Sequence, residues 1–190
     1  MKTALMVGAL SCASVVASAQ FLALGDLTDG TSQSATFPEG SSSGVNDSTT
    51  WHMWTVNANA GDMIDITVFR VGPSLDPMSA AFVGDASGMT VPVGVPLWET
   101  TTVSAALGLE FAGSGDDEVD DPYGGPWGDP SYGFMATETG TYTVFVANFL
   151  SLPTGEQRYD ITVSGSTWIP APSAMALLGM GGLVAGRRRR

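Results

Sequence analysis

Apolar and polar residues alternate with period two along much of the middle of this 190-residue chain. Ile64, Ile66 and Val68 share one face of an extended segment, and Asp65 and Thr67 share the other. This is the period of a half-buried strand and not the 3.6-residue period of a helix. The same pattern predicts strands at 50–56, 132–135, 141–146 and 159–163, and weaker ones at 34–37, 79–83 and 101–111.

Turn-forming residues separate these predicted strands. Asn59-Ala60-Gly61-Asp62 follows one long strand and Glu138-Thr139-Gly140 precedes another. Glycine and asparagine tolerate the backbone angles of tight turns. No interior window has a helical period, and the segment 91–107 has a mixed pattern that we leave unassigned. Many short strands with one apolar face each predict an all-β fold, an antiparallel β-sandwich over residues 20–168.

The first nineteen residues have the three parts of a secretory signal peptide. Lys2 precedes an apolar run, and Ala17-Ser18-Ala19 supplies the small residues that signal peptidase accepts. We expect residues 1–19 to form a signal helix that is removed between Ala19 and Gln20. The exported protein would then lack Cys12, the only cysteine, and could form no disulfide. Lipidation of Cys12 is the alternative.

Residues 169–190 combine a Pro-x-Pro motif, a short apolar segment and a basic end, namely Pro170, Ala171 and Pro172, then Arg187, Arg188, Arg189 and Arg190. The apolar part is shorter than the ~20 residues that a spanning helix needs, and arginines favour the cytoplasmic side. This order resembles the PEP-CTERM sorting signal of bacteria, with Ala171 where that family has Glu. The resemblance implies a hydrophobic sorting helix inserted transiently in the membrane, and cleavage near the motif by an exosortase-type membrane protease. It also implies delivery to the cell surface or extracellular matrix. An ordinary tail anchor is the alternative.

Two stretches in the middle of the chain share their order of motifs with a second family. The first is TWHMWTVNANAGDMIDITVFRV, followed by Leu75-Asp76-Pro77, and the second is DPSYGFMATETGTYTVFVANF, followed by RYDITVSG. Together they resemble the bacterial pre-peptidase C-terminal (PPC) domain, a small jelly-roll-like β-sandwich often attached to secreted hydrolases. The resemblance implies that the antiparallel β-sandwich expected here is jelly-roll-like. No catalytic domain accompanies the module in this sequence, so the resemblance implies binding or scaffolding.

Charge is distributed unevenly along the chain. Residues 20–168 hold all nineteen acidic residues but only Arg70 and Arg158 as basic ones, which gives a formal net charge of −17. Such a surface repels a phosphate backbone, so we expect no nucleic-acid partner. Binding of cations, or solubility alone, accounts better for the charge.

The densest acidic stretch is a candidate Ca²⁺ site. Hard cations bind six to eight oxygens, and crowded carboxylates repel one another until a cation enters. An EF-hand is not expected, because Asp121 stands where that loop requires glycine and Trp127 where it requires glutamate. The alternative is a solvated acidic turn. The candidate ligands are Asp116, Asp117, Glu118, Asp120 and Asp121, with Asp76 as a more distant one.

Aromatic residues near this loop offer a surface for stacking a sugar ring. Trp127 and Tyr123 belong to the segment Tyr123-Gly-Gly-Pro-Trp127 and are the candidate ligand contacts, whereas Trp54 is expected in the core. The alternative is that loop aromatics cover one end of the sandwich.

The sequence offers little for catalysis. His52 is the only histidine, no Gly-x-Ser-x-Gly segment accompanies it, and a zinc site would need more His or Cys ligands. We therefore expect a non-catalytic binding or structural module, exported and associated with the cell surface or with exopolysaccharide. A Ca²⁺-dependent carbohydrate-binding module and a small secreted hydrolase are the alternatives.

Overall fold

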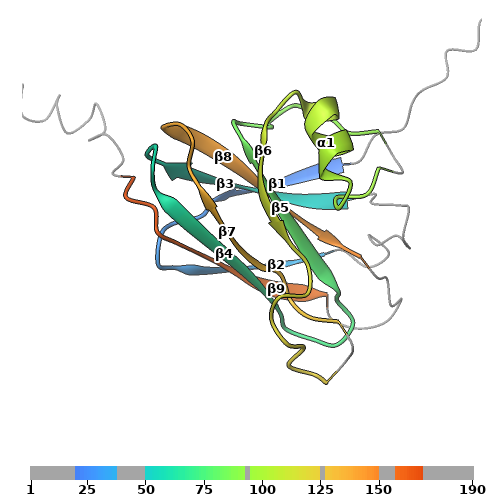
Figure 1. Cartoon of the computed structure of the whole chain (residues 1–190). Helices are drawn as coiled ribbons and strands as arrows, with labels where there is room; N and C mark the ends of the chain where they lie inside the picture. The colour runs from blue at the N-terminus through green and yellow to red at the C-terminus, as the bar shows by residue number, and fades with distance from the viewer. Residues whose placement is uncertain (1–19, 38–49, 93–94, 125–126, 150–156, 169–190) are drawn as a thin grey trace, which may run out of the picture.

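Two β-sheets packed face to face form the body of the protein (Figure 1). The computed structural model describes residues 20–37, 50–92, 95–124, 127–149 and 157–168. One sheet contains, in spatial order, β1 (Gln20–Asp26), β3 (Thr50–Ala58), β8 (Gly140–Asn148), β5 (Pro77–Val83) and β6 (Phe111–Gly115). The other contains β2 (Ser32–Thr36), β9 (Arg158–Ser164), β4 (Met63–Arg70) and β7 (Ser131–Met135). The predicted all-β sandwich is confirmed.

The space between the sheets is filled by the alternating apolar residues. Ile64, Ile66 and Val68 of β4 are fully buried, and so are Val144 of β8 and Ile161 of β9. The antiparallel β4–β9 register places Val68 opposite Ile161, so the inward faces of the two strands coincide. The predicted orientation of these strands is therefore confirmed, as is the burial of Trp54.

A second apolar layer covers the outer face of the five-stranded sheet. Phe82 and Phe145 point to this face and pack with residues of the segment that follows β5, including Val103 and Leu107. Figure 1 shows the helix α1 (Thr100–Leu107) of this segment at that side of the sheet. Because β8 is thus covered on both faces, Thr143 and Phe145 are as buried as the inward-facing Val144.

The strand predicted at 101–111 is wrong. Residues Thr100–Leu107 form α1, and only Phe111–Gly115 form a strand. Val103 and Leu107, four residues apart, bury one face of the helix, and Gly108 ends it with φ 66°. Threonine-rich sequence favours strands locally, so burial of this apolar face outweighs the local preference.

An N-terminal strand was not anticipated from the sequence. β1 lies parallel to β3, whereas the other strand pairs within the described residues are antiparallel. Phe21 secures it, with its ring centroid 4.7 Å from that of Phe145 and 5.6 Å from that of Trp51. The mature chain expected to begin at Gln20 would therefore begin directly in a sheet strand.

The single histidine lies inside the sandwich and not at a surface. Trp54 Nε1 donates a hydrogen bond to Tyr159 Oη, which lies 2.9 Å from His52 Nδ1. Phe37 stacks on the imidazole at a centroid distance of 3.9 Å. Burial lowers the pKa of His52 to about 4, so the ring is neutral at physiological pH. Its environment is that of a core residue.

The predicted signal helix at 1–19, its cleavage site at Ala19 and the sorting tail at 169–190 lie outside the described residues. In the described part of the chain, no helix has the length and apolar character needed to cross a bilayer.

Candidate cation site

Arg70 organises the end of the sandwich where β4 stops. Arg70 lies on the same inward face of β4 as Ile64, Ile66 and Val68, at the end of the apolar core. Its side chain is only 2% exposed, so the guanidinium charge is buried. A buried charge is costly unless it is paired and hydrogen-bonded. Acidic side chains from three loop positions provide the pairing.

The strongest of these partners is Asp129, which is fully buried. Arg70 Nε donates to Asp129 Oδ1 at 2.6 Å, and the backbone N–H of Arg70 donates to Asp129 Oδ2 at 3.2 Å. Arg70 Nη2 donates to Asp76 Oδ1 at 3.4 Å and also to the carbonyl of Gly128. Asp121 Oδ2 lies 3.8 Å from Nη1. The guanidinium thus fixes the positions of the surrounding acidic loops.

Three carboxylates gather on one side of this ion-pair cluster. One oxygen from each of Asp76, Asp116 and Asp117 lies within 4.8 Å of the others. The sheet explains their proximity: β5 begins next to Asp76, β6 ends next to Asp116, and the antiparallel β5–β6 pair joins Ser79 to Gly115. Residues forty positions apart in sequence are therefore neighbours in space.

The electrostatics of this trio favour a bound cation or proton. Burial raises the pKa of Asp76 to about 7; Arg70 opposes the rise, and Asp116, Asp117 and Asp129 add to it. Burial also raises the pKa of Asp116 to about 6, with further contributions from Asp117 and Glu118. One guanidinium therefore does not balance the negative charge collected here.

The other predicted ligands take different positions. Glu118 Oε2 accepts hydrogen bonds from the backbone N–H groups of Asp116, at 2.8 Å, and Ser131, at 3.1 Å. Asp121 lies on the Arg70 side of the cluster, and its Oδ1 accepts the N–H of Tyr123 at 2.6 Å. Asp120 is exposed and is not a member of the trio. The structure therefore brings together three of the six candidate ligands, two from the acidic loop and Asp76, which directly precedes β5.

Both predicted aromatic ligand contacts lie at this end of the molecule and are accessible. Tyr123 is 48% exposed and donates a hydrogen bond from its hydroxyl to the Val71 carbonyl. Trp127 is 44% exposed and directly precedes Gly128, which accepts from Arg70. The backbone next to each ring is therefore hydrogen-bonded to the ion-pair cluster, through the Gly128 carbonyl beside Trp127 and through the N–H of Tyr123 to Asp121.

Sequence reasoning missed the roles of Arg70 and Asp129. A signal was present for Arg70, because it is one of only two basic residues between 20 and 168. A lone arginine at the end of an apolar alternation has to find acidic partners if the strand stays buried. Asp129 follows the densest acidic stretch, but nothing in its sequence position shows that it faces inward.

No model of a known protein family matches this chain, and no match was found among curated proteins. Several solved structures are similar to this chain in fold, at low sequence identity. CorA, a surface-associated copper-binding protein of Methylomicrobium album BG8, is 15% identical with a TM-score of 0.47, over 76% of this chain and 99% of CorA. The pre-peptidase C-terminal domain of a Bacillus anthracis collagenase is 13% identical with a TM-score of 0.39, over 77% of this chain and 96% of that one.

A third similar structure is PliG of Aeromonas hydrophila, a periplasmic inhibitor of g-type lysozyme. It is 14% identical with a TM-score of 0.45, over 76% of this chain and 98% of PliG. At this level, none of the three similarities assigns a ligand or an activity to the present chain.

Proposed function

We propose that this protein is an exported, non-catalytic β-sandwich module that binds Ca²⁺ through Asp76, Asp116 and Asp117. The observation that carries the proposal is the approach of three carboxylate oxygens to within 4.8 Å of one another. A divalent cation among them would relieve a repulsion that Arg70 alone leaves in place.

The donor set matches a hard cation. All three side chains offer oxygen, which Ca²⁺ prefers, and none offers the imidazole or thiolate that zinc and copper favour. Bidentate carboxylates and water would complete the six to eight oxygens of a Ca²⁺ shell. Asp76 is held by Arg70 and by its own N–H bond to Asn148 Oδ1, at 3.1 Å, so one ligand is fixed in advance.

We expect Ca²⁺ to raise the melting temperature of the protein. At a hundred-fold excess over its dissociation constant, a ligand specific to the folded state adds ~2.7 kcal/mol to the free energy of unfolding. Mg²⁺ should add less, because it requires a tighter octahedron and gives up water reluctantly. Thermal unfolding in CaCl₂, in MgCl₂ and in NaCl of equal ionic strength provides the measurement.

Two variants with the same change of charge sharpen this test. Asp117→Asn should remove the Ca²⁺ shift, whereas Asp120→Asn, three residues away and outside the trio, should keep it. Equal shifts with all three salts, or equal loss in both variants, would show that the loop is a solvated acidic turn.

The two ends of the chain support export and sorting as a second part of the proposal. Signal peptidase would remove residues 1–19, and an exosortase-type protease would cut near Pro170 and release the domain to the surface or exopolysaccharide. The native protein should then have an intact mass that corresponds to a chain from Gln20 to the region of Pro170. A mass that includes Arg187–190 would refute the cleavage and favour a retained anchor.

A Ca²⁺-dependent carbohydrate-binding module is the second candidate function. It is favoured by the exposed rings of Trp127 and Tyr123, whose segments are hydrogen-bonded to the Arg70 cluster, since aromatic faces stack on the C–H faces of sugars. A glycan array probed with and without Ca²⁺ distinguishes the two. Binding that requires both Ca²⁺ and Trp127 would support the module, and no binding would leave a cation-stabilised structural role.

A further inference from the structure

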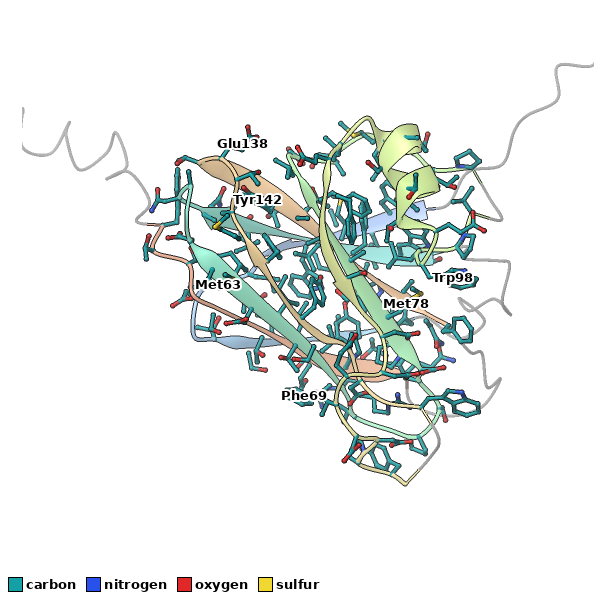
Figure 2. The ribbon with its side chains drawn as sticks, in the orientation of Figure 1. Met63, Phe69, Met78, Trp98, Glu138 and Tyr142 are labelled. Carbon is teal, nitrogen blue, oxygen red and sulfur yellow. The ribbon has the colours of Figure 1, made fainter. Side chains whose placement is uncertain are left out.

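A pocket lies at the opposite end of β4 from the cation site. It is lined by two acidic residues, a tryptophan, a leucine and three small polar residues, namely Asp26, Leu27, Thr28, Asp29, Asn57, Ser166 and Trp168. In Figure 1 the blue connection from β1 to β2 and the red segment after β9 meet at this end, near the start of β4. Figure 2 labels Met63 at this end of β4 and Phe69 at the other.

The backbone that leads to Trp168 is fixed by hydrogen bonds of the two preceding residues, Ser166 and Thr167. Ser166 N–H donates to Asp29 Oδ1 at 3.0 Å, and Ser166 Oγ donates to the Asn57 carbonyl at 2.6 Å. The backbone and hydroxyl of Thr167 donate to Asp62, at 2.9 Å and 2.6 Å. The segment that follows β9 is thus tied to the β1–β2 turn and to β3, which fixes the backbone that carries Trp168.

The charge in this pocket is not neutralised. Its lining contains two carboxylates and no basic residue, and neither Asp26 nor Asp29 forms an ion pair with another residue that the structure describes. Both carboxylates are exposed and each already accepts a hydrogen bond, Asp26 from the hydroxyl of Thr55 and Asp29 from the N–H of Ser166. What they lack is a countercharge, which a neutral ligand would not supply. A bare metal ion would gain little from the indole, whereas a cationic organic group gains from both carboxylates and from the ring face.

From these observations we propose that the pocket binds an organic cation of the size of an arginine or lysine side chain. The pocket has a volume of about 290 Å³, close to the lower limit for ligand sites, and this suits one side-chain head group and its stem. The site is distinct from Asp76, Asp116 and Asp117, so it stands or falls independently of Ca²⁺ binding.

Isothermal titration of the purified chain with L-argininamide tests this proposal. The control ligand is L-citrullinamide, which replaces the guanidinium by a neutral urea of nearly the same shape. We expect a dissociation constant on the order of 1 mM for argininamide, typical of a ligand of this size, and at least tenfold weaker binding of citrullinamide. A short peptide with one internal arginine, Ac-Gly-Arg-Gly-NH₂, shows whether a side chain alone is sufficient.

Variants at the pocket and away from it complete the test. Asp29→Asn and Trp168→Ala should each weaken argininamide at least threefold. Asp65→Asn removes the same charge from an exposed position of β4 outside the pocket and should change binding by less than a factor of two. Absence of binding at 10 mM, equal binding of the two amides, or equal loss in Asp65→Asn and Asp29→Asn would overturn the proposal.

Discussion

Replacing Arg70 by methionine is expected to destabilise the protein by about 3–5 kcal/mol. The substitution would leave fully buried Asp129 and nearly buried Asp76 without their cation. Removal of one partner from a buried ion pair costs far more than the pair contributes, because the remaining charge has no water. Urea unfolding followed by tryptophan fluorescence measures the change.

Arg158 provides a matched control, since it is the only other arginine in the described residues. It pairs with Asp160 at 3.4 Å, but the two side chains are 41% and 36% exposed. Arg158→Met should therefore cost no more than about 1 kcal/mol. If Arg70→Met costs as little as Arg158→Met, Arg70 does not organise the acidic loops in the way proposed here.

Truncation of core side chains is expected to cause the second large loss in the free energy of unfolding. Ile161→Ala and Ile66→Ala should each cost about 2–5 kcal/mol, because both side chains are fully buried between the sheets. Thr162→Ala, one residue further along β9 and on the opposite face, should cost about 0.5 kcal/mol or less. Similar costs for Ile161→Ala and Thr162→Ala would contradict the assignment of the inward face of β9.

Strands with one polar face were predicted well from the sequence. In β4, Asp65 and Thr67 mark the outward side and the isoleucines mark the inward side, so the period alone fixes which face is buried. The same holds for β9. Alternation is informative wherever one side of a sheet meets solvent.

The parts that could not be predicted depend on contacts made elsewhere in the chain. α1 has a β-like local sequence and is helical because Val103 and Leu107 cover the outer face of the five-stranded sheet. β1 depends on Phe21 packing against Phe145, more than a hundred residues away. Neither partner can be identified from a local pattern.

The candidate cation site could likewise be predicted from the sequence only in part. The acidic stretch at 116–121 was evident from composition, and Asp76 was anticipated as a distant ligand. Which acids meet is decided by the β5–β6 pairing and by Arg70, which directs Asp121 and Asp129 to itself. Sequence proximity therefore overestimates the number of ligands that one cation can reach.

Titration of the protein with Ca²⁺ in a calorimeter tests the central claim most directly. We predict one Ca²⁺ per chain, competition by Mg²⁺ only at much higher concentration, and no detectable binding in Asp117→Asn. Asp120→Asn should bind as the unaltered protein does. No heat of Ca²⁺ binding in the unaltered protein, or equal weakening by the two substitutions, would contradict a site formed by Asp76, Asp116 and Asp117.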